Sequence, residues 1–204
     1  FLDEATEFAP SVLDSLREPL ESGRIHLHRS GVQATYPAAF QLVMASNPCP
    51  CGGGRGGRGC SCSSLNRRRY LSRLSGPLLD RMDIRIDMHT PSRADMATGA
   101  AQDSASIRQR VCEARERARH RLRDTPWVTN AQLPGAWIRR CSGIAPDLVE
   151  QIDRLVEAGR ASMRGADRML RLAWTLADLE GAKSVTLDHI VAAEQLRNGS
   201  DHRE

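Results

Sequence analysis

Two carboxylates follow a short apolar segment at the start of the chain. Asp3 and Glu4 come directly after Phe1-Leu2, which resembles the end of a buried strand whose beginning lies outside this sequence. The carboxyl ends of strands are where α/β folds bind ligands. There, one carboxylate can hold Mg²⁺, and the second can orient or deprotonate a water molecule. The alternative is an acidic pair that only stabilises the dipole of a following helix.

A polar residue also follows the next apolar segment. Residues 40–46 are nearly all apolar, which is typical of a buried parallel strand, and Asn47 comes immediately afterwards. If both strands lie in one sheet, Asn47 reaches the same edge as Glu4. Its amide can there hydrogen-bond both a phosphate oxygen and a water molecule. An Asx turn before Pro48 is the alternative.

Two arginines are candidates for phosphate contacts. Arg81 lies between Asp80 and Asp83, just before a predicted strand. Its guanidinium keeps its charge and offers a planar fork for phosphate oxygens, unless a local salt bridge occupies it. Arg164, in the segment SMRGADRML, stands at the start of a predicted helix.

Four cysteines lie within a glycine-rich loop and have the spacing C-x-C-x₈-C-x-C. They are Cys49, Cys51, Cys60 and Cys62. Four thiols joined by a flexible loop can surround a tetrahedral Zn²⁺, although the spacing differs from the usual C-x₂-C. Free thiols in a mobile loop are one alternative. Disulfides are another, which a reducing cytosol disfavours.

The elements that must position these residues change in type along the chain. We predict a helix over 10–22, a hairpin over 24–36 that turns at Ser30-Gly31, a helix over 65–75 and a strand over 84–88. Beyond a polar stretch, apolar residues recur at helical spacing in four segments, which cover 111–122, 148–156, 169–177 and 186–196. The sequence therefore predicts an α/β part over 1–90, a linker over 91–105 and an all-helical part over 106–204.

Positive charge is concentrated in two stretches. Residues 55–85 hold eight arginines and two acids, and residues 108–123 hold seven arginines and two acids. Clustered arginine favours a phosphate partner, either nucleotide or nucleic acid, although a solvated helix face is the simpler interpretation of the second stretch. No apolar run approaches the roughly 18 residues of a membrane span, so we expect a cytoplasmic protein without a membrane partner.

The predicted hairpin carries a further basic group. Arg24, His28 and Arg29 are candidate nucleic-acid contacts. His26 and His28 share one face of the first strand and suggest a metal, but with no third ligand nearby a solvated or nucleic-acid-facing edge is the preferred interpretation.

Five segments of the sequence resemble, in order, the magnesium-chelatase-like or ComM group of AAA+ ATPases. They are FLDEATEF, VLDSLREPLESG, TYPAAFQLVMASNPCPCG, RYLSRLSGPLLDRMDIRID and ASMRGADRMLRLAWTLADLEG. The resemblance implies part of a P-loop ATPase core, in which a hairpin insertion faces a central pore, followed by a helical lid. It assigns Asp3 and Glu4 to the end of the Walker B strand, Asn47 to sensor 1, Arg81 to the arginine finger and Arg164 to sensor 2.

The same resemblance implies a ring-forming ATPase, expected to be hexameric, that uses ATP and Mg²⁺ to remodel DNA, as in branch migration during natural transformation. A subunit that drives metal insertion into a porphyrin is the alternative, and a zinc-stabilised binding module without catalysis is a third. The 204 residues contain no G-x-x-x-x-G-K-[ST] loop. We therefore expect this chain to be the carboxy-terminal part of a longer protein and to hydrolyse no ATP by itself.

Overall fold

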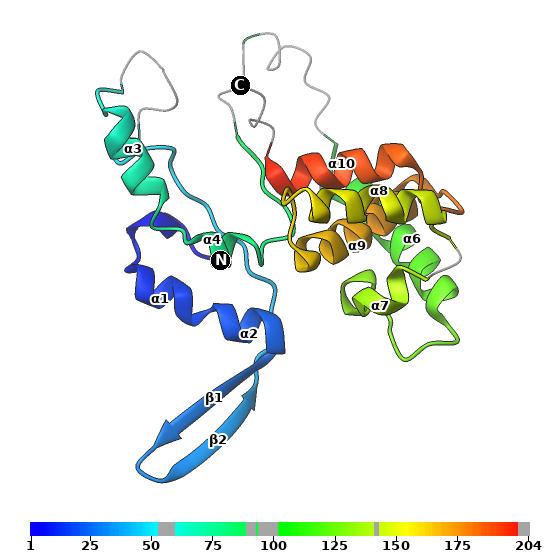
Figure 1. The fold of residues 1–204 in the computed structure, drawn as a ribbon, viewed down its shortest axis with the longest axis horizontal. Helices are drawn as coiled ribbons and strands as arrows, with labels where there is room; N and C mark the ends of the chain where they lie inside the picture. The colour runs from blue at the N-terminus through cyan, green and yellow to red at the C-terminus, as the bar shows by residue number, and fades with distance from the viewer. Residues whose placement is uncertain (53–59, 89–92, 94–101, 141–142, 200–204) are drawn as a thin grey trace. The chain divides into compact units, whose positions relative to one another are not determined.

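The structure, a computed structural model, describes residues 1–52, 60–88, 93, 102–140 and 143–199. It is mixed α/β, with mostly helices and a two-stranded sheet (Figure 1). Contacts divide the chain into unit 1, Phe1–Met82, and unit 2, Asp83–Glu204. Most of the predicted linker, 91–105, lies outside the described residues, although its last two residues already belong to a helix.

Unit 1 contains short elements. They are the 3₁₀ helix η1 (Ala5–Glu7), the helices α1 (Pro10–Ser15), α2 (Arg17–Ser22), α3 (Ser64–Leu71) and α4 (Gly76–Leu79), and the strands β1 (Arg24–Arg29) and β2 (Val32–Pro37). The predicted helix over 10–22 is thus broken at Leu16. The break places Pro19 in the first turn of α2, where no backbone N–H is needed.

The hairpin forms as the alternating pattern predicts. β1 and β2 pair antiparallel, with Ile25 opposite Tyr36 and His28 opposite Gln33. Ser30 and Gly31 both have positive φ, 46° and 82°, as the tight turns of two-residue hairpin loops require. In unit 1 the hairpin continues from the end of α2 (Figure 1), and every residue of β1 is exposed.

The other predicted strands are shorter than expected or do not form. Residues 40–46 contribute only a parallel bridge between Met44 and Leu2. The prediction of a strand over 84–88 is wrong, since these residues have no regular secondary structure and pair with no strand among the described residues. Alternation predicts an extended chain, but a strand also needs a neighbouring strand. Here the Arg85 amide instead donates to the Leu196 carbonyl, at 2.6 Å, in the last turn of a helix, where carbonyls have no partner within the helix itself.

Unit 2 is mostly helical, and helices form in each of the four segments predicted from helical spacing. Its elements are α6 (Ser104–Leu122), η2 (Asn130–Gln132), α7 (Gly135–Ile138), α8 (Pro146–Glu157), α9 (Met163–Glu180) and α10 (Leu187–Asn198). α9 contributes most of the core, with Leu170, Ala173 and Trp174 fully buried, and α6, α8 and α10 pack against it. α9 ends at Glu180 and is capped by Gly181, whose φ is positive, and Thr186 caps α10.

A buried polar network joins α6, η2 and α9. Arg121 donates from two nitrogens to the carboxylate of Asp178, whose side chain is 3% exposed, and Asn130 donates to the same carboxylate at 2.9 Å. The Arg121 guanidinium also stacks on Trp174, 3.8 Å from the ring centre. Asp178 therefore neutralises a guanidinium that lies against the apolar core.

Replacing Asp178 by Ala should unfold unit 2 at much lower denaturant concentration. Removal of one partner from a buried ion pair leaves the other charge uncompensated, at a cost of about 3–5 kcal/mol. Denaturation followed by tryptophan fluorescence measures the change, since all three tryptophans, including the buried Trp174, lie in unit 2. Glu150→Ala is the control, since it breaks an exposed pair with Arg154 and should cost less than about 1 kcal/mol. Equal losses in the two variants would contradict the prediction.

Candidate functional site

Two short segments of the chain pair with each other in parallel. Asp3 and Glu4 come just after one segment, and Asn47 comes just after the other. The Leu2 amide donates to the Val43 carbonyl at 2.9 Å, and the Ala45 amide donates to the Leu2 carbonyl at 2.9 Å. The segments run parallel, and a further bond joins the Ala5 amide to the Ala45 carbonyl at 2.8 Å. Glu4 and Asn47 thus lie beyond the same end of the paired segments, and both are exposed.

Glu4 has an unusual backbone conformation. Its φ and ψ are 48° and 45°, in the left-handed region, which a residue with a side chain enters at a cost of about 1–2 kcal/mol. The Asp3 carboxylate accepts the Glu4 amide at 3.0 Å and holds this turn in place. Such strain concentrates at functional sites. The two adjacent, exposed carboxylates also provide the hard oxygen atoms that suit Mg²⁺.

Two residues of the α3 region, which the sequence did not single out, contact the turn that follows Glu4. Arg73 donates to the Thr6 carbonyl at 2.8 Å and forms an ion pair with Glu7. Contact with Thr6 lowers the pKa of the buried Tyr70, but burial and the carboxylates of Glu7 and Glu4 raise it, and the net shift is upward. These partners lie more than sixty positions apart in the sequence, so no local pattern marks them.

Arg81 is held within unit 1. Its guanidinium donates to the Arg17 carbonyl at 2.9 Å, to the Pro77 carbonyl at 2.8 Å and to the Glu21 carboxylate at 2.5 Å. Its side chain is 11% exposed. The salt bridge with Glu21 therefore joins Arg81 to α2.

Arg164 lies in unit 2, on the first turn of α9, and is exposed. Ser162 caps this helix by accepting the Gly165 amide at 3.0 Å. Arg168, one turn later on the same helix, forms an ion pair with Asp83.

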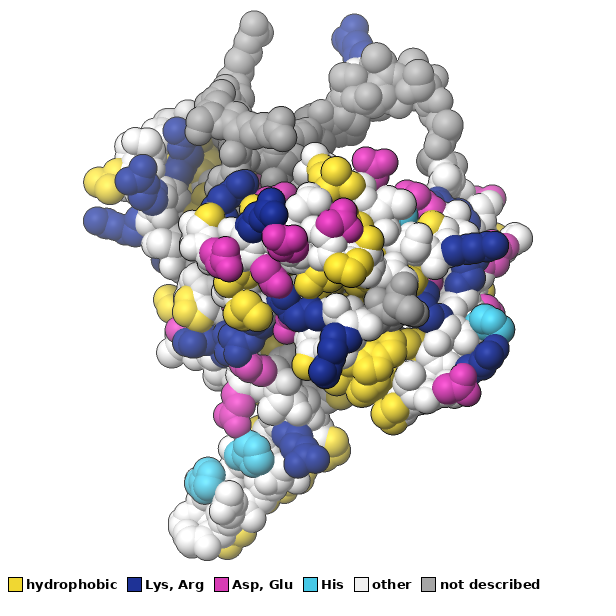
Figure 2. Space-filling view, turned by 45° about the vertical axis from the view of Figure 1, so that its right-hand side comes forward, with side chains coloured by type: hydrophobic (Ala, Val, Ile, Leu, Met, Phe, Trp, Pro, Cys, Tyr) yellow, Lys and Arg dark blue, Asp and Glu magenta, His cyan; other side chains and the backbone are white. Residues whose placement is uncertain are grey.

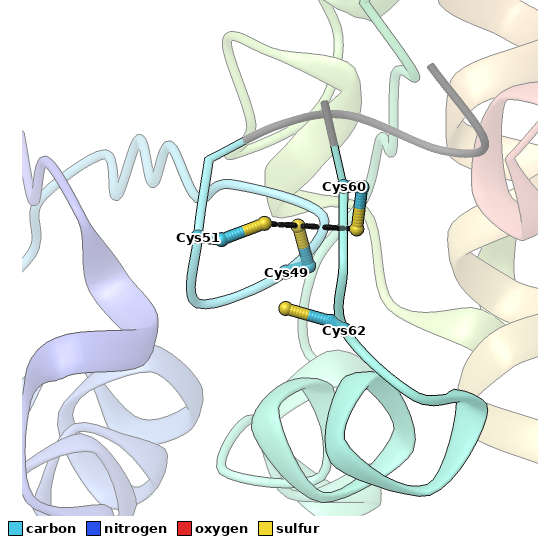
Figure 3. Close-up of side chains that lie close together, drawn as sticks. All are labelled: Cys49, Cys51, Cys60 and Cys62. Atoms are coloured by element: carbon cyan, nitrogen blue, oxygen red, sulfur yellow. Dashed lines mark hydrogen bonds between the residues drawn. The ribbon is translucent and has the colours of Figure 1, made fainter. Parts of the chain in front are cut away.

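The four loop cysteines come together in unit 1. Their sulfur atoms all lie within 4.8 Å of one another and can hold a metal ion. The Sγ atom of Cys49 is 3.3 Å from that of Cys51 and 3.6 Å from that of Cys60. Figure 3 shows the four side chains converging from the two sides of the loop. The arginines of this loop, Arg55 and Arg58, lie outside the described residues.

Crowding among the thiols raises the pKa of two of them, Cys60 and Cys62. A hydrogen bond with the Cys51 thiol and burial raise the pKa of Cys62 to about 11. For Cys60, the Cys62 backbone lowers the pKa, whereas the thiols of Cys49 and Cys51 raise it, and the net shift is upward. Coordination to a divalent cation would lower the pKa of these thiols instead, because a coordinating thiol is deprotonated.

The hairpin presents basic side chains on both faces. The register puts Arg24, His26 and His28 on one face and Arg29 on the other. His26 hydrogen-bonds Thr35 at 2.9 Å and lies 3.7 Å from Glu18. Figure 2 shows histidine and basic side chains along the hairpin, at the bottom of that view. In the described part of the chain, no helix has both the length and the apolar content to cross a membrane.

Two protein families match the chain in succession. Residues 1–96 match the family described as magnesium chelatase, subunit ChlI, and residues 101–197 match the family described as magnesium chelatase, subunit ChlI C-terminal.

Individual relatives cover nearly the whole chain. An uncharacterized protein of Mycobacterium tuberculosis is 42% identical over 203 residues, which are 100% of this chain and 40% of that protein. Competence protein ComM of Haemophilus influenzae is 36% identical over 95% of the chain and 37% of its own length. The magnesium-chelatase 38 kDa subunit of Rhodobacter capsulatus is 26% identical over 93% of the chain and 48% of its own length. This chain thus spans less than half the length of these relatives.

Proposed function

Because this chain belongs to the magnesium-chelatase-like, or ComM, family of AAA+ ATPases, we propose that it is part of a ring ATPase that couples ATP hydrolysis to the remodelling of DNA. The observation that carries the proposal is the parallel pairing of Leu2 with Met44, since it delivers Glu4 and Asn47 to one end of the paired segments. The full-length protein would assemble as a homo-oligomeric ring, expected to be a hexamer, in the cytoplasm.

Each site residue has a role in this proposal. Asp3 holds Mg²⁺, which neutralises charge on the ATP phosphates. Glu4 accepts the proton of the attacking water, and Asn47 hydrogen-bonds that water and the γ-phosphate. Arg81 and Arg164 donate to phosphate oxygens, Arg81 from the neighbouring subunit. The proposed cofactors are ATP, Mg²⁺ and, at the cysteine cluster, Zn²⁺.

Exposed apolar side chains support the view that unit 1 is part of a larger core. Phe1, Phe40 and Val43 flank the paired segments, and all three are exposed. In an α/β core such residues pack against neighbouring strands and helices. The full-length protein would supply these, together with the phosphate-binding loop, and the 204 residues alone would hydrolyse no ATP.

DNA remodelling is preferred to metal insertion for two reasons. The relative whose name refers to competence is 36% identical to the chain, and the chelatase subunit is 26% identical. The exposed hairpin also carries Arg24, His28 and Arg29, which suit a phosphate backbone. A chelatase-type subunit shares the ATPase residues, so only the partner distinguishes the two functions.

Binding of four-way DNA by the full-length protein should weaken steeply with salt, and the double variant Arg24→Gln/Arg29→Gln should reduce that dependence. Each phosphate contact releases counterions and contributes roughly 0.9 to the slope of log affinity against log salt, so two lost contacts should lower the slope by about two. Fluorescence anisotropy at several salt concentrations measures it.

A matched control keeps the change in net charge the same. The double variant Arg154→Gln/Arg160→Gln removes two exposed arginines of unit 2 that pair with Glu150 and Glu194, and it should leave the slope unchanged. Equal slopes for the hairpin variant and the wild type would remove the hairpin from the DNA interface. Failure of the wild type to prefer four-way over linear DNA would favour the chelatase-type function.

A further inference from the structure

We propose that the four cysteines bind one structural Zn²⁺, and that this ion positions both segments that carry the proposed catalytic residues Glu4 and Asn47. The metal site itself rests on the geometry of the sulfur atoms. Its positioning role rests on the proposed ATPase function.

The arrangement of the sulfur atoms fits a single tetrahedral ion. A Zn–S distance of about 2.3 Å places the sulfurs of a tetrahedron about 3.8 Å apart. The sulfurs of Cys49, Cys51 and Cys60 are 3.3, 3.6 and 3.6 Å apart, and all four sulfurs lie within 4.8 Å of one another. A disulfide would bring two sulfurs to about 2.05 Å. The space among the four atoms suits one ion, and four thiolates in a closed site favour zinc.

The ligands come from two chain segments. Cys49, which is fully buried, and Cys51 follow Asn47 by two and four positions. Cys60 and Cys62 lie three and one positions before Ser63, which caps α3 by accepting the Asn66 amide at 3.2 Å. The ion would therefore join the end of the Asn47 segment to the beginning of α3 (Figure 3).

α3 has little else to hold it. It is eight residues long, a length at which an isolated helix is marginal in water. Of its apolar residues only Tyr70 is buried, whereas Leu65 is 63% exposed, and its sequence includes the three consecutive arginines Arg67 to Arg69. A helix without an apolar stripe needs an external anchor. A metal one residue before its cap supplies that anchor.

α3 then reaches the other proposed catalytic segment. Tyr70 lies against Thr6 and Glu7, and Arg73, just beyond the helix, donates to the Thr6 carbonyl. These two acceptor residues belong to η1, which begins directly after Glu4. Asn47 is thus linked through Cys49 and the ion to α3, and α3 is linked through Tyr70 and Arg73 to the turn of Glu4.

The test compares Cys60→Ser/Cys62→Ser with Cys112→Ser, which removes an exposed free cysteine of α6 outside the cluster. Elemental analysis of the full-length protein should find about one zinc per chain in the wild type and in Cys112→Ser, and at least about tenfold less in the double variant. Hydrogen exchange should then be faster by about tenfold or more in residues 5–7 and 64–71 of the double variant, with α9 unchanged. Removal of zinc from the wild type with a chelator repeats the comparison without any mutation.

Each outcome bears on the proposal. Absence of zinc from the wild type, iron in its place, or full zinc in the double variant would overturn the site. Zinc loss without faster exchange in residues 5–7 would overturn the positioning role. Neither readout needs ATP or DNA, so a wild type that binds zinc as expected but hydrolyses no ATP would contradict the proposed function and leave the metal site standing.

Discussion

Arg81→Ala should reduce ATP hydrolysis by the assembled full-length protein by about 10³ to 10⁵, the range over which an arginine finger contributes to phosphoryl transfer. The arginine stabilises charge that develops on the phosphoryl oxygens in the transition state. Turnover measured at saturating ATP, where binding no longer limits the rate, gives the effect directly. Oligomer size is measured in parallel, since the finger acts only in an assembled ring.

The contacts of Arg81 within unit 1 offer a second explanation for a loss of ATP hydrolysis in Arg81→Ala, namely a structural role of the side chain. In this structure its guanidinium is held by Glu21 and by two backbone carbonyls, so it must exchange these partners to reach a neighbouring nucleotide. Arg81→Ala therefore also removes hydrogen bonds from a part-buried site, at a cost of about 1–3 kcal/mol. A purely structural role would lower the stability of unit 1 and the rate together.

Two variants separate the explanations. Arg81→Lys keeps the charge but loses the fork that binds phosphate oxygens, so its rate should stay close to that of Arg81→Ala. Glu21→Gln weakens the internal pair and leaves Arg81 in place, so its rate should stay near that of the wild type. A rate of ATP hydrolysis near that of the wild type in Arg81→Lys, or a large loss of that rate in Glu21→Gln, would favour a structural role for Arg81.

Local patterns predict most of the elements that the structure describes. Alternation along residues 24–36 and the Ser30-Gly31 turn define the hairpin, because a slip of one residue would move Tyr36 off the face that Ile25 and Leu27 share. Helical spacing of apolar residues over 169–177 and 186–196 likewise predicts α9 and α10, because each helix buries one face against the same core. The common end reached by Glu4 and Asn47 also follows from sequence, since each stands just after an apolar segment.

Features that depend on distant partners could not be predicted in this way. Ile84 to Met88 alternate like a strand, but the partner that their backbone meets, Leu196, lies more than a hundred residues away. Arg81 bonds Glu21, sixty positions away in sequence, because the fold, and not the sequence spacing, brings α2 beside it. Cysteine spacing indicates that a cluster is possible, whereas the separation of the sulfur atoms is a property of the folded loop.

Glu4→Gln in the full-length protein should lower ATP hydrolysis by about 10² to 10⁴, the contribution of a positioned general base. Gln is nearly isosteric with Glu and keeps the backbone amide that donates to Asp3, so the left-handed turn should persist. ATP affinity should change little, because the lost carboxylate acts on the water. Single-turnover hydrolysis and equilibrium ATP binding separate the two quantities. Similar losses of the hydrolysis rate and of ATP affinity would mean that Glu4 contributes to ATP binding rather than to proton transfer.

Mixing the two inactive proteins tests whether Glu4 and Arg81 belong to one site shared by neighbouring subunits. In a ring with head-to-tail interfaces, an Arg81→Ala subunit still carries Glu4, and an adjacent Glu4→Gln subunit still carries Arg81. Random equimolar rings would complete about a quarter of their sites, so turnover should rise to about a quarter of the wild-type rate if the sites act independently. Absence of any recovery in rings shown to exchange subunits would mean that both residues act within one subunit. Arg81 would then be assigned to the contacts it makes with Arg17, Pro77 and Glu21 rather than to a neighbouring nucleotide.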